Sequence, residues 1–412
     1  MIPLMHAVRA IAIAIFVFPL PTLWAQSEFV DSRSKVVNVF LQDNFLNTKN
    51  CMVIGIIDEH GSRVFSAGAL DNGTENKVDG DSIFELGSLT KPFTCLLMLD
   101  AASRNELKLA DPVSKFVPAD IQLPSWNGKR ITLSNLASHE SGLPWHPHGS
   151  KRRSIKELKS AADAVTIRDL YAHLAKVKLS RPPGTEYSYS NVGYALLGRA
   201  IEEAANSDYD SLVRDRICTP LKMANTSIAL TPEQKLHRAR GHWNDGARSE
   251  HVNFQAMAPA GSLHSTANDL LKFLAANLSH DDSPLTPLMD QMRGPPHHKL
   301  KRFGNTALGW KDNGVYNPPG TELWGHGGGG GGGGFGNLAF VGFDVKKRRG
   351  VVVLTNQMKI NPNGVGWTLL QEMPFTRSNI ARPVRKVVGI GIAALNKDRK
   401  SGNIIIAGVY PR

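Results

Sequence analysis

Ser88 and Lys91 are spaced as a nucleophile and its proton acceptor would be. Ser88 follows Gly87 and opens an apolar segment with helical periodicity, over residues 89–104. A lysine three positions after a serine lies on the same helical face, so its ammonium group can reach the serine oxygen. A helix start also favours developing negative charge. Because an alcohol is a poor nucleophile until a neighbour removes its proton, the pair predicts a serine activated by a desolvated lysine.

The S-x-x-K pattern is weak evidence on its own, and ordinary helix capping by Ser88 is the alternative. The segment Ser32-Arg-Ser-Lys35 has the same spacing near the start of the chain, without such an apolar context. The assignment therefore depends on what accompanies Ser88 elsewhere in the sequence.

A second polar group, Tyr189-Ser-Asn191, ends the turn-rich run Pro182–Asn191, and an apolar helix follows it. Tyr189 could pass a proton between the nucleophile and the leaving group if Lys91 stabilises its tyrosinate form. Asn191 could donate a hydrogen bond to a substrate carbonyl and hold Lys91. Helix capping is the alternative for Asn191, and by itself this residue favours that role.

A third element, Trp324-Gly-His-Gly-Gly-Gly329, runs into further glycines up to Gly334. Glycines allow a substrate to lie against a strand edge, and a backbone N–H here could join that of Ser88 in an oxyanion hole. The tract also contains G-x-G-x-x-G, but a strand follows it, not the helix that a dinucleotide site requires. A flexible linker is disfavoured by the same strand.

In this order and spacing, S-x-x-K, Y-S-N and H-G-G resemble the serine β-lactamase-like superfamily over about residues 30–373. The branch is that of class C β-lactamases, D-alanyl-D-alanine peptidases and family VIII esterases. Further segments support the resemblance: Phe84–Lys91, Leu109–Val113, Ile131–His139, Ser141–Pro144, Ala260–Thr266, Leu308–Trp310 and Gly350–Asn356.

The resemblance implies a role for each motif residue and catalysis without a metal or organic cofactor. Ser88 would be acylated, and the resulting acyl-enzyme would then be hydrolysed. Lys91 and Tyr189 would share the acid–base work. The substrate-binding residues would be Asn191, His326, Gly328 and Gly329, with the N–H groups of Ser88 and Gly329 forming the oxyanion hole. His139 is expected to buttress a helical subdomain rather than take part in the chemistry.

The sequence departs from the family in its third motif. Many relatives have Lys-Thr-Gly, whereas this chain has His326-Gly-Gly. A lysine suits a substrate carboxylate, while a histidine is largely neutral at pH 7, which shifts the expectation from β-lactams towards peptides or esters. The run Gly327–Gly334 is also longer than usual and could loosen the strand that aligns the substrate.

The elements around these motifs indicate an α/β (α+β) fold with one antiparallel sheet built from both ends of the chain. Hairpin patterns cover residues 52–67 and 338–355, and helical patterns lie between them, besides an opening helix over 28–47 and a closing one over 363–373. Flanking helices and a helical subdomain complete this β-lactamase/transpeptidase-like expectation. The helical patterns lie at 89–104, 167–178, 192–205 and 266–278.

The chain divides into three parts by composition. Residues 1–25 resemble a signal peptide, because Arg9 precedes a short apolar core, and they predict a periplasmic or secreted protein. An uncleaved anchor is the alternative, although the apolar run is shorter than a membrane span. Residues 26–373 form the hydrolase domain. Residues 374–412 form a basic extension that resembles the opening strands of a PDZ domain.

The net charge of +12 does not indicate nucleic-acid binding, because much of it lies in the extension and in the cluster Lys151–Lys156. Such basic segments in an exported protein fit an anionic envelope surface or simple solubility. The three cysteines do not form a disulfide framework, and a Cys51–Cys218 bridge stays open. No segment after the signal predicts a membrane span.

Two functions follow from these residues. The first is an exported serine hydrolase that acts on D-amino-acid peptides, esters or β-lactam-like amides, with small molecules, peptides or peptidoglycan as partners. The second is a catalytically weak sensor or binding module of the cell envelope, which the long glycine run motivates. Four intact polar residues, Ser88, Lys91, Tyr189 and Asn191, favour the first.

Overall fold

The computed structural model describes most of the region between residues 28 and 381. The described ranges are 28–147, 165–249, 251, 254–294, 298–300, 304–312, 317–329 and 336–381. The expected signal peptide and the PDZ-like part of the C-terminal extension lie outside them.

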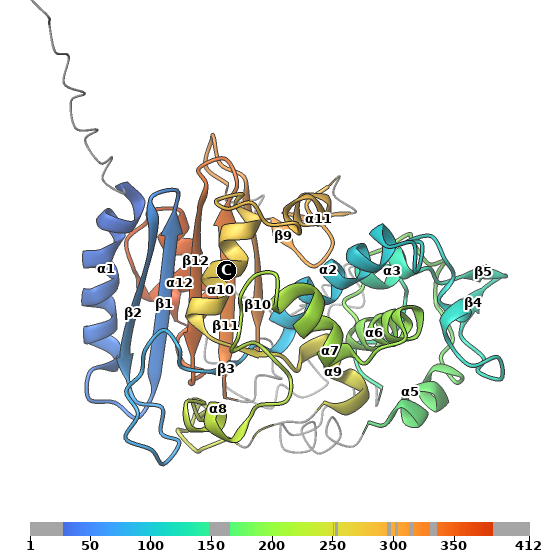
Figure 1. The fold of residues 1–412 in the computed structure, drawn as a ribbon, viewed down its shortest axis with the longest axis horizontal. Helices are drawn as coiled ribbons and strands as arrows, with labels where there is room; N and C mark the ends of the chain where they lie inside the picture. Colours follow the sequence, from blue (N-terminus) through green and yellow to red (C-terminus); the bar gives the residue numbers. More distant parts are fainter. Residues whose placement is uncertain are drawn as a thin grey trace, which may run out of the picture.

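The core of the molecule is an eight-stranded antiparallel sheet that joins the two ends of the described chain (Figure 1). Its strand order is β2-β1-β12-β11-β10-β9-β8-β7. The N-terminal hairpin pairs with the C-terminal one through β1 and β12, with Ile54 opposite Val353. The strands are β1 (Cys51–Asp58), β2 (Gly61–Gly68), β7 (His298–Leu300), β8 (Gly304–Thr306), β9 (Lys311–Asp312), β10 (Leu323–Gly328), β11 (Leu338–Asp344) and β12 (Arg349–Thr355). The sheet expected from both termini is confirmed.

Alternate residues of β1 face two separate hydrophobic cores, as the period of two in a strand requires. Met52 and Ile54 belong to the core formed with α1 (Glu28–Phe45) and α12 (Pro362–Leu370). Val53 and Ile57 belong to the larger core on the opposite face, which α10 (Ala267–Asn277) covers. Because both faces are covered, β1 is buried along its whole length.

The helical subdomain lies beside the sheet, at the end opposite α1 (Figure 1). The helices α2 and α6 are its centre, and α2 is buried from Thr90 to Ala101. The helices of this part and its neighbours are α2 (Thr90–Ser103), α3 (Leu133–Ala137), α5 (Ile167–Leu174), α6 (Asn191–Ala205), α7 (Tyr209–Val213), α8 (Pro232–Leu236), α9 (Ala258–Gly261) and α11 (Thr286–Met292). One-turn helices cover Gly87–Leu89, Val113–Phe116, Arg214–Cys218 and Gln255–Met257.

Two short strand pairs form small sheets of their own, separate from the eight-stranded sheet. Strand β3 (Phe84–Glu85) pairs with β6 (His264–Ser265), and β4 (Ser125–Trp126) pairs with β5 (Lys129–Arg130). The β3–β6 pair directly precedes the turn that carries Ser88. Leu86 N–H donates to the Leu263 carbonyl at 2.8 Å, so the same ladder continues towards that turn.

The helical patterns expected at 28–47, 89–104, 167–178, 192–205, 266–278 and 363–373 each correspond to a helix of the structure. Residues 374–381 contain α13 (Arg377–Ile380) and pack on the body. The Phe375 and Phe40 rings lie 4.3 Å apart, and Asn361 N–H donates to the Ile380 carbonyl at 2.7 Å. The first residues of the extension are thus part of the folded body.

All three cysteines are buried and unpaired, so the Cys51–Cys218 bridge does not form. Cys95 instead lies 3.1 Å from the Tyr194 hydroxyl inside the helical core. Within the described residues, no helix combines the length and the apolar character that a membrane crossing needs.

Candidate active site

Ser88 lies in the one-turn helix Gly87–Leu89, directly before α2, and Lys91 is the second residue of α2. Lys91 Nζ hydrogen bonds to Ser88 Oγ at 3.0 Å and donates to the Ala260 carbonyl at 2.6 Å. The reach across three helical positions expected from the sequence is therefore present. The Ala260 carbonyl anchors the amine from the opposite side.

The Tyr189 hydroxyl also hydrogen bonds to Ser88 Oγ, at 2.7 Å. Lys91 Nζ lies 4.9 Å from the centre of the Tyr189 ring and 5.3 Å from that of Tyr194. Two groups able to exchange a proton thus converge on one serine oxygen from α2 and from the loop before α6. This arrangement can remove the serine proton and return it to a leaving group.

Lys91 is fully buried, and no carboxylate is among the groups that shift its pKa. Burial, and then the positive charge of Lys311, lower the pKa of the Lys91 amine well below its ordinary value. A low-dielectric surrounding disfavours the ammonium form, so the neutral amine becomes available as a proton acceptor.

Asn191 is the first residue of α6, but it does not cap that helix. The cap is Ser190, whose hydroxyl accepts from Gly193 N–H at 2.8 Å, so the capping role considered for Asn191 is wrong. Asn191 Oδ1 is buried without a hydrogen-bond partner. The hydrogen bonds of Lys91 run to Ser88 and to Ala260.

His139 supports the loop that carries Tyr189. Its Nδ1 accepts from Ser190 N–H at 3.1 Å, and its ring lies 4.3 Å from that of Tyr189 and 4.8 Å from that of Tyr194. Burial, together with the Lys91 and Lys311 charges, lowers its pKa well below the ordinary value. The neutral ring accepts at Nδ1 and carries its proton on Nε2, which fits the buttressing role expected from the sequence.

The end of strand β10 closes against the turn that contains Ser88. A side chain at Gly328 would place its Cβ 1.6 Å from the Leu86 carbonyl oxygen, so only glycine fits there. A Cβ at Gly87 would lie 2.5 Å from the Gly329 nitrogen, and both residues have positive φ. The backbone of Gly329 therefore adjoins the nucleophile turn, where an oxyanion hole with Ser88 was expected.

His326 lies on the same strand, buried, with Nδ1 lacking a hydrogen-bond partner. Burial and the Lys311 charge lower its pKa well below the ordinary value. The third motif thus presents an uncharged imidazole at neutral pH, as the sequence indicated.

Lys311 is the residue that sequence reasoning missed. It lies on β9 opposite Gly325 of β10, and its Nζ is 5.4 Å from the centre of the Tyr189 ring. Its charge also acts on Lys91, His139 and His326. A cation therefore stands beside the site, one strand away from the position of the missing third-motif lysine. The signal available was its place directly after Leu308-Gly-Trp310.

Comparisons with known proteins show the family to which this chain is related. The sequence model of the Beta-lactamase family matches residues 48–372. The D-alanyl-D-alanine-carboxypeptidase/endopeptidase AmpH of Escherichia coli K12 is 30% identical over 246 residues, which are 59% of this chain and 61% of that protein. Penicillin-binding protein 4 of Amycolatopsis lactamdurans is 28% identical, over 64% of this chain and 70% of that protein.

Two solved structures share the fold. A Yersinia pestis β-lactamase/D-alanine carboxypeptidase complexed with citrate has a TM-score of 0.68 at 24% identity, over 84% of this chain and 97% of that chain. A class C β-lactamase has a TM-score of 0.69 at 19% identity, over 85% and 98%. These likenesses concern the fold, whereas the family match covers most of the sequence. The chain belongs to the Beta-lactamase family.

Proposed function

We propose that this protein is an exported serine hydrolase that forms an acyl-enzyme at Ser88 and cleaves peptides or esters with an anionic end. The observation that carries the proposal is the convergence of Lys91 Nζ and the Tyr189 hydroxyl on Ser88 Oγ, at 3.0 and 2.7 Å. Peptidoglycan-derived D-amino-acid peptides are the first substrate class to examine, since the name of the AmpH relative specifies a D-alanyl-D-alanine carboxypeptidase.

The reaction would begin with proton transfer from Ser88 to neutral Lys91 as Oγ attacks the substrate carbonyl. The N–H groups of Ser88 and Gly329 would stabilise the oxyanion, and the amide of Asn191, whose Oδ1 has no hydrogen-bond partner, would orient the substrate. Tyr189 would pass the proton to the leaving group. Water would then hydrolyse the ester, with Tyr189 and Lys91 removing its proton. No metal or organic cofactor enters these steps.

Lys311 favours substrates that carry a carboxylate. The neutral His326 offers no charge to such a group, whereas the Lys311 ammonium lies beside Tyr189 on the neighbouring strand. A lysine ammonium attracts a carboxylate as a compact point charge. The loss of the third-motif lysine is therefore compensated in charge, although not in position.

A periplasmic or secreted location is part of the proposal, supported by the signal-like residues 1–25. Mass spectrometry of the mature N-terminus after expression in a bacterial host would check it. A protein retained in the cytoplasm with its first residues intact would contradict it.

The test is a substrate panel in which only the charge at one end changes. A D-Ala-D-Ala peptide, its C-terminal amide, a p-nitrophenyl ester and a penicillin would each be incubated with the wild type and Ser88→Ala. We expect turnover of at least one acyl donor by the wild type alone, with the free carboxylate preferred over the amide. Binding without turnover of any donor would contradict the proposal and support an envelope sensor.

A further inference from the structure

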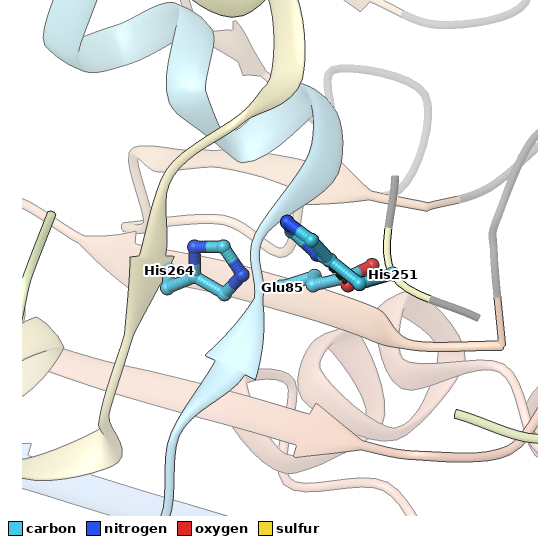
Figure 2. Close-up of side chains that lie close together, drawn as sticks. All are labelled: Glu85, His251 and His264. Carbon is cyan, nitrogen blue, oxygen red and sulfur yellow. Dashed lines mark hydrogen bonds and ion pairs between the residues drawn. The ribbon is translucent and has the colours of Figure 1, made fainter. Parts of the chain in front are cut away.

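Three potential metal ligands, Glu85, His251 and His264, lie close together near the segment that carries Ser88. The pairing of β3 with β6 sets Glu85 opposite His264, and His251 approaches from another part of the chain (Figure 2). One ligand atom from each of Glu85, His251 and His264 can be chosen so that all three lie within 4.8 Å of one another. His251 Nδ1 lies 2.7 Å from Glu85 Oε1, and the two histidine rings are 5.1 Å apart.

The His264 side chain is buried, and its ring nitrogens have no hydrogen bonds. Its side chain is 1% exposed, and neither Nδ1 nor Nε2 is in hydrogen-bonding geometry with any group. Buried imidazoles are ordinarily hydrogen bonded at one nitrogen or both. The ring faces the pair formed by Glu85 and His251 (Figure 2). An unsatisfied ring turned towards a carboxylate and a second imidazole requires an explanation.

An ordinary ion pair explains only part of the cluster. Glu85 and His251 satisfy each other, and His251 is partly exposed at the surface. The His264 ring is buried beside this pair, and neither of its nitrogens meets the geometry of a hydrogen bond, so the ion pair leaves its position unexplained.

We propose that Glu85, His251 and His264 bind a divalent transition metal ion of the zinc class. Two imidazoles and one carboxylate are a ligand set that zinc accepts. Zinc–nitrogen and zinc–oxygen bonds of about 2.0–2.2 Å place tetrahedral donors roughly 3.3 Å apart. On metal binding, the 2.7 Å distance between His251 Nδ1 and Glu85 Oε1 would lengthen slightly, and the longest distances between ligand atoms would shorten. Side-chain rotation can achieve both changes. Water would complete the coordination.

The ion would fasten two segments that build the active site. Glu85 lies three residues before Ser88, and His264 lies four residues after Ala260, whose carbonyl anchors Lys91. A metal bridge between β3 and β6 would hold these segments in register. Its role is structural, so the Ser88 chemistry still proceeds without a metal, and the site is independent of the proposed activity.

The experiment measures metal content and melting temperature of the full mature chain, with any histidine tag removed. Protein stripped with a chelator would be equilibrated with Zn²⁺ or Co²⁺, dialysed and analysed for bound metal. The variants are His251→Ala, Glu85→Gln and His264→Gln. His60→Ala is the matched control, because His60 lies 3.8 Å from Glu59 in a surface histidine–glutamate pair that belongs to no three-ligand cluster within the described residues.

We expect about one equivalent of metal in the wild type and in His60→Ala, with a melting temperature raised by several degrees on zinc addition. Co²⁺ should give the visible absorption of a site with nitrogen and oxygen ligands. His251→Ala should lose at least tenfold in affinity together with the thermal shift. Its side chain is partly exposed, so this variant is expected to fold even if His264→Gln does not. A wild type that retains no stoichiometric metal, or a His251→Ala protein that retains as much as the wild type, would overturn the proposal.

Discussion

The Ser88 site has two walls, the α2 side with Lys91 and the β9 side with Lys311, and the two lysines differ in burial. On the α2 side, Lys91 is completely buried, and its surroundings favour the neutral amine. On the β9 side, Lys311 is only partly buried and acts as a cation on Lys91, His139 and His326. In the proposed mechanism Lys91 accepts a proton, and Lys311 attracts the anionic end of the substrate. Burial, not residue type, separates the two roles.

The largest expected effect concerns the nucleophile that lies between these walls. Ser88→Ala should lower kcat/KM for every acyl donor by about 10⁴-fold or more, because no covalent intermediate can form. Stopped assays with purified variant and wild type measure this loss. Comparable turnover by Ser88→Ala would place the chemistry elsewhere.

The next effect tests whether Lys91 acts as a base or as a cation. Lys91→Arg keeps a positive charge but cannot lose its proton at neutral pH, so we expect a loss of about 10²–10⁴-fold. Lys91→Ala should be similarly impaired. Circular dichroism and thermal melting would show whether both variants fold. A folded Lys91→Arg enzyme with nearly full activity would mean that Lys91 acts as a cation and not as a base.

A smaller effect is expected on the other wall. Lys311→Ala should weaken kcat/KM for a substrate with a free carboxylate by roughly 10–100-fold, the value of one hydrogen bond to a charged group. The amide of the same substrate should change little, and Lys311→Arg should retain most of the preference. Equal losses on the carboxylate and amide substrates would mean that Lys311 supports the site without recognising charge.

The smallest expected effect is a shift in the pH dependence of kcat/KM, because the charge of Lys311 acts on Lys91. The neutral amine of Lys91 is the active form, so kcat/KM should rise with pH as Lys91 loses its proton. Because the Lys311 charge lowers the pKa of Lys91, Lys311→Ala should raise that pKa and move the acidic limb of the profile to higher pH. A limb that stays in place, or moves to lower pH, would contradict this coupling.

The features that sequence reasoning found are those with a local pattern. Apolar runs on either side of a turn identified β1 and β12, helical spacing identified α2 and α6, and fixed spacing along the chain linked Ser88 to Lys91. The helix cap was misplaced by one residue because both Ser190 and Asn191 are capping types, and only the backbone conformation distinguishes them.

The features that were missed depend on pairing between distant segments. Lys311 reaches the site because β9 lies beside β10, and His264 meets Glu85 because β6 pairs with β3. Each of β3, β6 and β9 has two residues, which is too short for any periodicity to appear. The cation beside the site and the histidine–glutamate cluster therefore became visible only in three dimensions.

The central claim is that Ser88 is acylated with the help of a neutral Lys91. The most direct measurement is an intact-mass time course of the mature protein with a penicillin and with an activated ester, for the wild type and Ser88→Ala, followed by peptide mapping. We predict an adduct of one acyl group on the wild type, mapped to Ser88 and absent from Ser88→Ala. An adduct that forms equally on Ser88→Ala, or acyl-donor turnover that persists without Ser88, would contradict the account.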